Sequence, residues 1–238
     1  MQLTITNIFN VVLYQPLVNL LIILYLYLPG QNLGLAIIVL TLITKAVLYP
    51  STQQSLKSQK LLNEIQPAVK EIQKKYKDNQ QKQAEEMMKL YKEKNFNPFS
   101  GILPLFIQLP IFIALYSMLN TGIGKEHLDL LYSFVQRPQE INQMFLGLDL
   151  SKPNLAFAFV VGIAQYFQGK TSMPPAAPKS GQDDQMAQFS GMMQKYMLYF
   201  FPIMTVAILA ALPSGLGLYW LVTTIFAIGQ NYLAFRKK

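Results

Sequence analysis

The chain has 238 residues, of which 52% are hydrophobic and only 13% are charged, and its formal net charge is +8. A soluble domain usually has about a quarter of its residues charged, so this composition excludes an ordinary soluble domain and indicates a membrane protein with one compact polar insertion. Because the chain has no cysteine and a single histidine, disulfide scaffolds, thiol nucleophiles and cysteine- or imidazole-based metal clusters are excluded as well.

The first apolar run covers 8–28 and ends at Pro29-Gly30. No basic residue precedes it, which is not typical of a signal peptide. As a span it would leave an uncharged N-terminus in the cytoplasm, against the preference of Lys and Arg for that side. We therefore predict that 1–32 forms an outer interfacial amphipathic helix, and a sixth span is the alternative.

Five further apolar runs predict helices that cross a hydrocarbon core about 30 Å thick. The expected boundaries of these five transmembrane helices are 33–54, 101–121, 151–169, 195–212 and 215–235. The apolar part of the third, 155–167, rises only about 20 Å as a helix. Either its polar flanks are drawn into the membrane or the bilayer thins around it.

The polar insertion 55–97 has the apolar period of two amphipathic helices, separated by a polar break at 77–81. This pattern predicts an antiparallel cytoplasmic helical hairpin. Two roles stay open: the hairpin only joins two spans, or it is a platform for partners or anionic headgroups. The other connections are expected to be an outer loop at 122–150, a cytoplasmic loop at 170–194 and a cytoplasmic tail at 236–238.

The basic residues predict the orientation, because Lys and Arg collect in cytoplasmic loops. Of the 20 basic residues, ten lie in the polar insertion and six more in the loop 170–194, its flank and the tail. Only three lie between the apolar parts of the second and third spans, 102–120 and 155–167. The fold class is therefore an all-α polytopic membrane protein, with the N-terminus outside and the C-terminus in the cytoplasm.

Lys45 is the remaining basic residue and lies inside the first span. A lysine at mid-helix costs about 2.5–3.5 kcal/mol on insertion scales, so it is expected to face protein or water and to have a function. The alternative is that the side chain snorkels to the headgroups, which lie about 10 Å away along the helix.

Other polar side chains of the spans favour the functional interpretation. Thr41 shares a helix face with Lys45, and most of the other polar groups also lie in the cytoplasmic halves of the spans. These are Gln108, Gln165, Gln168, Gln230 and Asn231. Together they predict a hydrated recess that opens to the cytoplasm and is sealed outside by nearly pure apolar residues.

Two features with possible chemistry are interpreted as structural. Gly169-Lys170-Thr171 resembles the end of a phosphate-binding loop, but the required first glycine is missing and no strand precedes it. His127, beside Glu126 and Asp129, is expected to be a solvated surface residue. We expect no catalytic residue, metal or cofactor, and the protein is not expected to be an enzyme.

The sequence resembles the YidC/Oxa family of membrane protein insertases over about 14–235. The motifs that carry the resemblance are specific in combination and in this order. They are Leu-Ile-Thr-Lys45-Ala-Val-Leu-Tyr-Pro50, Ile65-Gln-Pro67, Lys89-Leu-Tyr-Lys-Glu-Lys followed by Asn97-Pro98, Ile107-Gln-Leu-Pro-Ile-Phe112, and Leu212-Pro-Ser-Gly-Leu-Gly-Leu-Tyr-Trp220 with Gln230 ten residues on.

The resemblance implies a positively charged groove that is open to the cytoplasm and to lipid. Lys45 matches the groove cation of the family, and Gln168 and Trp220 match groove-facing positions; Thr41 and Gln108 complete the candidate substrate-binding residues. Bacterial members commonly have arginine where Lys45 stands. Lysine keeps the charge but lacks the planar fork that binds a carboxylate through two hydrogen bonds.

We therefore expect an insertase and chaperone that uses no energy source of its own. It would move short polar segments of nascent membrane proteins through the groove and release their apolar helices into the lipid bilayer. The ribosome, the signal recognition machinery and the Sec translocon are candidate partners, and no specific nucleic acid is expected. The alternative is a small-solute transporter or channel, which needs polar residues through the whole thickness of the membrane.

Overall fold

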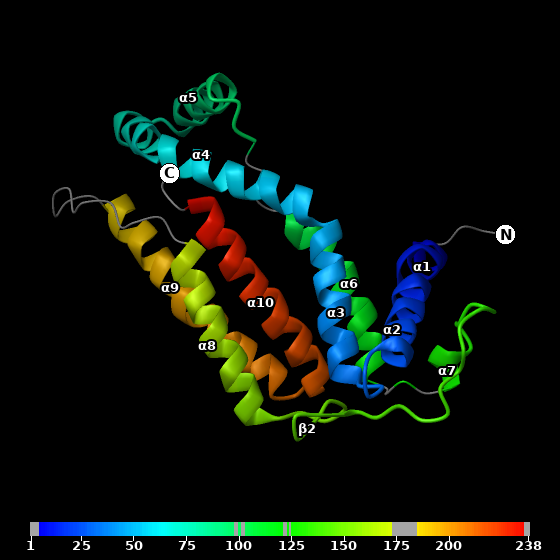
Figure 1. Ribbon diagram of the computed structural model, residues 1–238. Coiled ribbons are helices and arrows are strands. Elements are labelled where there is room, and N and C mark those ends of the chain that lie inside the picture. The colour runs from blue at the N-terminus through cyan, green and yellow to red at the C-terminus, as the bar shows by residue number, and fades with distance from the viewer. Residues whose placement is uncertain are drawn as a thin grey trace. The chain divides into compact units, whose positions relative to one another are not determined.

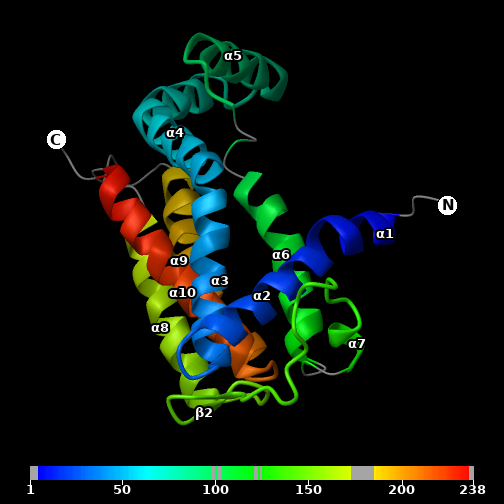
Figure 2. The ribbon, with the colours of Figure 1, turned by 45° about the vertical axis from the view of Figure 1, so that its right-hand side comes forward.

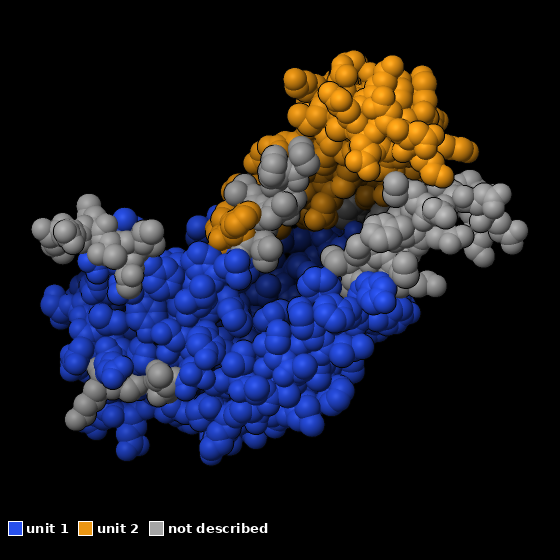
Figure 3. Space-filling view, turned by 180° about the vertical axis from the view of Figure 1, so that it is seen from behind, with its two compact units in different colours: residues 1–47, 108–232 blue, residues 48–107, 233–238 orange. Residues whose placement is uncertain are grey.

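The computed structural model describes residues 5–97, 100, 103–120, 123, 125–172 and 185–235, and these residues are mostly helical (Figure 1). The chain divides into two compact units, coloured separately in Figure 3. Unit 1 contains 1–47 and 108–232, and unit 2 contains 48–107 and 233–238. The expected tail 236–238 and the central part of the expected loop 170–194 lie outside the described residues.

Unit 1 begins with helix α1 (Ile5–Phe9), the π-helical turn η1 (Asn10–Tyr14) and helix α2 (Gln15–Tyr27). A turn at 28–32 leads into α3 (Leu33–Val47), and Gly30 in this turn has φ +74°. Asn32 accepts a hydrogen bond from the backbone N–H of Leu35 at 3.1 Å, which satisfies one free donor at the start of α3. The buried apolar faces of α2 and α3 lie against each other.

Length and composition alone make Asn7–Tyr27 a helix that can cross a membrane, and α3 with α4 meets the same criterion as a pair. Two shorter apolar helices, Phe106–Asn120 and Leu198–Leu209, lie in the other expected spans. The glutamines of the third span and Gln230-Asn231 in the fifth lower the hydropathy of those helices. The number of spans and the interfacial position of 1–32 therefore stay predictions.

Part of the expected outer loop 122–150 is ordered against α2. It contains the short helix α7 (Lys125–Leu128) and the strands β1 (Met144–Phe145) and β2 (Leu148–Asp149), which pair antiparallel. The amides of Gln15 and Asn19 both donate to the Leu130 carbonyl at 3.0 Å. Asn19 Oδ1 also accepts the Tyr132 N–H at 2.7 Å. The polar residues that interrupt the first apolar run thus hold the outer loop.

His127 is not a solvated surface residue, and the expectation from the sequence is wrong. Its side chain is only 5% exposed, and its ring meets that of Tyr14 at 6.3 Å between centroids. Burial lowers the pKa of this histidine, because the charged imidazolium loses its hydration. The neighbouring acidic residues suggested a polar surface, whereas the contact with Tyr14 depends on tertiary structure.

The second half of unit 1 contains α8 (Leu155–Ser172), α9 (Gln185–Leu209) and α10 (Ser214–Phe235). Helices α8 and α9 pack closely because Gly162 has no side chain: a Cβ there would lie 2.5 Å from Val206 Cγ2. The sequence 170–194 was expected to be a loop, and this is wrong at both ends, since α8 continues to Ser172 and α9 already begins at Gln185. Glutamine, methionine and lysine are good helix formers, so a polar composition did not imply a loop here.

Unit 2 contains α4 (Tyr49–Lys75) and α5 (Gln80–Glu93), and the chain turns between them at 76–79. Asn79 caps α5 by accepting the Lys82 N–H at 3.0 Å. The expected first span 33–54 is interrupted, because α3 ends at Val47 and α4 begins at Tyr49. Pro50 explains this break: proline has no N–H to donate within a continuing helix but fits the first turn of a new one.

Helix α6 (Leu103–Asn120) supplies Gln108 to unit 1 and contains Pro110. Figures 1 and 2 show α3, α6 and α10 next to one another in unit 1, with α8 and α9 on the other side of α10.

Candidate functional site

Lys45 lies in the last turn of α3, and its side chain is half-buried. Its ammonium group donates a hydrogen bond to Gln108 Oε1 on α6, with Nζ and Oε1 2.9 Å apart. Lys45 is therefore held by a polar neighbour within the protein.

Gln108 is bonded on both sides. While its carbonyl oxygen accepts from Lys45, its amide nitrogen donates to the hydroxyl of Tyr219 on α10. The Tyr219 side chain is 3% exposed. The two bonds fix which way the amide of Gln108 points, so the acceptor faces the ammonium. Three helices are thus joined by one row of polar groups in an otherwise apolar region.

Thr41 and Trp220 were expected to line the groove, and both have contacts within the protein. Thr41 is 0% exposed, and its hydroxyl donates to the Ile37 carbonyl of its own helix at 2.6 Å. Trp220 is half-buried, meets Phe112 edge to face at 5.6 Å, and packs against a core cluster of α8 and α9. These contacts account for both side chains as packing residues, and they leave the expected groove role a prediction.

Gln168 lies on α8, where its backbone carbonyl accepts the hydroxyl groups of Thr171 and Ser172 at 2.8 and 2.9 Å. Among the described contacts, its side chain has no hydrogen bond to Lys45, Gln108 or Tyr219. The structure therefore joins two of the five predicted residues directly, Lys45 and Gln108. It adds Tyr219, which the sequence analysis missed. A signal was present, since Tyr219 puts a hydroxyl on an apolar helix within the distinctive motif that ends at Trp220.

Several polar atoms of α8, α9 and α10 are buried without a hydrogen-bond partner among the described residues. They are Gln165 Oε1, Thr205 Oγ1, Thr223 Oγ1 and Gln230 Nε2. Nearby, the Asn231 amide donates to Ser172 Oγ at 2.6 Å. Buried polar atoms that lack a protein partner are suited to bind water. These buried polar atoms fit a hydrated region beside α8, α9 and α10.

No carboxylate pairs with Lys45 within the described ranges, where the ion pairs involve Lys89, Arg137 and Lys152. The same residues hold no group of three or more side chains able to bind a metal ion. The Lys45 site therefore presents a cation with one neutral acceptor and has capacity for an anion.

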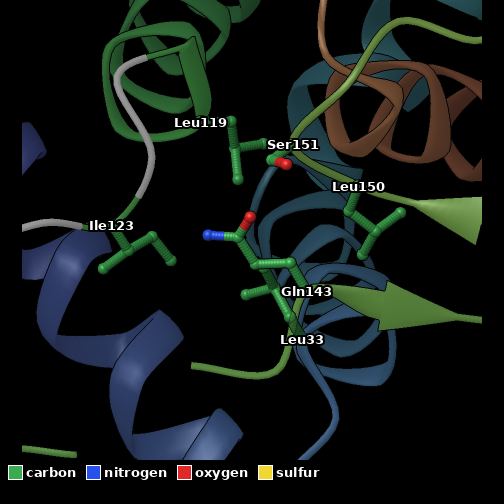
Figure 4. A pocket seen from close by; sticks show the side chains of 6 residues that line it. All are labelled: Leu33, Leu119, Ile123, Gln143, Leu150 and Ser151. Carbon is green, nitrogen blue, oxygen red and sulfur yellow. The ribbon is translucent and has the colours of Figure 1, made fainter. Parts of the chain in front are cut away.

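A small cavity lies elsewhere in unit 1, between α3, α6 and the segment 143–151 (Figure 4). Its lining is mostly apolar and consists of Leu33, Leu119, Ile123, Gln143, Leu150 and Ser151. It contains none of the predicted groove residues, and Leu33 places it at the opposite end of α3 from Lys45.

A family model described as 60Kd inner membrane protein matches residues 23–238. Several curated proteins named membrane protein insertase YidC are similar to the chain. That of Prosthecochloris aestuarii is 34% identical over 203 residues, which cover 84% of this chain and 32% of that protein. That of Chlorobium limicola is 33% identical over 204 residues, covering 85% and 33%. That of Francisella tularensis subsp. novicida is 32% identical over 205 residues, covering 86% and 33%. The chain thus spans about a third of the length of these relatives.

Proposed function

The chain belongs to the 60Kd inner membrane protein family, and on this basis we propose that it is a membrane protein insertase whose substrate site is centred on Lys45. The observation that carries the proposal is the half-buried ammonium between α3 and α6, bonded to the neutral Gln108 and to no carboxylate of the described residues. A cation in such a place attracts an acidic segment of a substrate.

The substrate segment enters from the cytoplasm, where the polar groups of α8 and α10 provide hydration. A polar peptide that stays hydrated avoids most of the cost of meeting hydrocarbon. Its carboxylate pairs with Lys45, and the pair is stronger than in bulk water because the local dielectric constant is lower. Lys45 thus acts as an electrostatic anchor, and Gln108 holds it in place.

Release into lipid needs no further chemistry. Leu155, Phe159, Ile163 and Phe167 recur every four residues along one face of α8, and each is more than half exposed. A substrate helix that leaves the groove can partition into lipid beside such a face. The burial of its apolar side chains drives the step, at about 25 cal/mol per Å² removed from water. The protein is therefore proposed to act as a chaperone for insertion and not as an enzyme.

The proposed topology has the N-terminus outside and the C-terminus in the cytoplasm of a bacterial cell. The contacts of α2 support the interfacial position of 1–32. Gln15, Asn19 and Tyr25 hold backbone groups of 129–142, a segment with an exposed Arg137–Asp129 ion pair. If α2 crossed the bilayer, this charged segment would be drawn into hydrocarbon, at a cost of several kcal/mol.

The proposed partners are nascent membrane proteins and lipid, with the ribosome, signal recognition machinery or Sec translocon delivering substrates. Unit 2 is the candidate surface for delivery, since α5 exposes Met88 among lysines and glutamates. Methionine is suited to transient apolar contacts with varied partners.

The experiment compares substrates with acidic and neutral outer tails in vesicles that contain the purified protein. Lys45→Ala is expected to slow insertion of the acidic-tailed substrate, whereas Lys45→Arg keeps it. Leu42→Ala is the matched control, because Leu42 lies on the same helix and is exposed. Full-rate insertion of the acidic-tailed substrate by Lys45→Ala would contradict the electrostatic role. Ion flux through the same vesicles without substrate would instead favour a channel.

A further inference from the structure

The β1–β2 hairpin has an unusual residue at its tip. The pairing of Phe145 with Leu148 leaves a two-residue turn, Leu146-Gly147. Both residues have positive φ, +50° for Leu146 and +81° for Gly147. Such a turn favours asparagine, aspartate or glycine at both positions. Leucine pays a steric penalty there, because its Cβ crowds the backbone in the left-handed region.

Leu146 is also 91% exposed, and Met144 before it is 50% exposed. The tip therefore breaks two independent rules, one of conformation and one of solvation. When local rules fail together, the exception often marks a functional position. An exposed leucine held in this strained conformation is placed to contact a partner that removes it from water.

The hairpin is held firmly, so its tip has a defined position. The ring of Phe145 lies where a Cβ on Gly34 would be, at the start of α3. Asn32 donates to the Met144 carbonyl at 3.4 Å, and the Leu150 N–H donates to the Gln143 carbonyl at 2.9 Å.

The surroundings identify lipid as the partner. The chain runs from β2 through 150–154 into α8, whose exposed apolar stripe begins at Leu155. In both ribbon views β2 lies at the same end of unit 1 as the start of α8 (Figures 1 and 2). At the base of the hairpin, Asp149 and Lys152 form an ion pair at 2.8 Å. An apolar tip above a charged base has the polarity profile of a membrane interface.

We propose that the β1–β2 hairpin inserts Leu146 at its tip into the outer leaflet, with the Asp149–Lys152 pair and Met144, which is paired with Asp149, at the level of the headgroups. Asp149 is paired with Met144, and Leu146 lies two residues beyond Met144, which corresponds to a reach of at most about 7 Å along a strand. That reach agrees with the depth of about 5–10 Å at which interfacial segments bury their apolar side. The proposal depends on the membrane position of the helices and is independent of insertase activity.

The chain has no cysteine, so a single spin label can be attached to Leu146→Cys in proteoliposomes of the full chain. Collisions of the label with oxygen, which concentrates in lipid, are compared with collisions with a water-soluble nickel chelate. Gln139→Cys is the water-exposed control in the same outer segment, and Phe159→Cys on α8 is the lipid control. The oxygen-to-nickel ratio at 146 is expected to exceed that at 139 by about threefold or more and to lie below that at 159. Equal ratios at 146 and 139 overturn the proposal.

A second variant separates lipid from other partners. Leu146→Asn suits the turn, so the hairpin stays folded, but it removes the apolar tip. A label at Met144→Cys is expected to lose oxygen contact in this variant, and an unchanged ratio would overturn the anchoring role of Leu146. Shielding of position 146 only at high protein-to-lipid ratio, or only after substrate is added, would assign the surface to a second copy or to substrate, and lipid anchoring would be wrong.

Discussion

Replacing Gln108 with glutamate tests the electrostatic account most directly, because it gives Lys45 an internal carboxylate with almost no change of shape. The acceptor oxygen of Gln108 already lies 2.9 Å from Lys45 Nζ. A carboxylate oxygen at that position attracts the ammonium by about 6 kcal/mol before desolvation, at an effective dielectric constant of about 20. Desolvation offsets much of this. Tyr219 can donate its hydroxyl proton to the new carboxylate, so no polar group is left without a partner.

The internal pair competes with the carboxylate of the substrate. A hydrogen bond to a charged group contributes about 1.5–3 kcal/mol, which corresponds to roughly a 10- to 150-fold change. Gln108→Glu is therefore expected to slow insertion of a substrate with an acidic outer tail by about one to two orders of magnitude. A substrate with a neutral tail is expected to keep its rate, because it makes no use of the ammonium. The assay is the initial rate at which the tail becomes protected from protease in proteoliposomes.

Two further variants separate charge from geometry. Gln108→Leu removes the amide without adding a negative charge, so it is expected to slow the acidic-tailed substrate less than Gln108→Glu does and to leave the rate of the neutral-tailed substrate unchanged. The exchange Lys45→Gln with Gln108→Lys moves the cation by about one hydrogen-bond length, and it is expected to keep the preference for acidic tails. The reasoning is refuted if a folded Gln108→Glu protein inserts the acidic-tailed substrate at the wild-type rate.

Two predictions concern stability. Gly162→Ala is expected to lower the free energy of unfolding in detergent by about 1–2 kcal/mol, because its Cβ would lie 2.5 Å from Val206 Cγ2. Val206→Ala should restore part of this loss in the double variant, whereas Gly229→Ala, with nothing within 4 Å of its Cβ, should be neutral or stabilising. Asn19→Ala is expected to release the segment near Leu130, since it removes three hydrogen bonds from a side chain 2% exposed. Faster amide exchange at 130–132 would show this release, and unchanged exchange would contradict it.

The sequence identified the family, and the match of the family model over 23–238 confirms the resemblance. A sequence motif is a set of residue types at fixed spacings, so it can be recognised without coordinates. The contact of Lys45 with Gln108 was partly foreseeable, because both lie in apolar runs and polar groups in lipid seek each other. Tyr219 was missed because an aromatic residue in a span is readily interpreted as packing. Its hydroxyl accepts a hydrogen bond from Gln108 only because α10 packs with this face toward α6.

The predictions from the sequence went wrong where they averaged composition over a segment. Acidic neighbours suggested that His127 is solvated, but contact with Tyr14 buries it. Hydropathy also did not reveal that Pro50 starts a new helix within the expected span 33–54, whose position in the membrane stays a prediction. A polar composition suggested a loop up to residue 194, while helical propensity extends α9 back to Gln185. In each case the average composition of a segment did not reveal how individual residues in it pack or which helix they form.

The two ends of unit 1 differ in how their polar groups are hydrogen-bonded. This difference supports entry of the substrate segment from the end that contains Lys45. At the end where α10 begins, Ser214 Oγ donates to the Lys152 carbonyl at 2.6 Å, and Gly215 N–H donates to the Leu150 carbonyl at 2.9 Å. Backbone groups paired in this way have few free hydrogen-bond donors or acceptors for a substrate peptide. Toward the other end, Gln165 and Gln230 keep buried polar atoms without described partners. A polar segment therefore gains hydrogen bonds on entering from the side of Lys45 and gains few at the far end. Only the apolar helix of the substrate lowers its free energy by leaving sideways into lipid, because a polar segment there would lose its hydration.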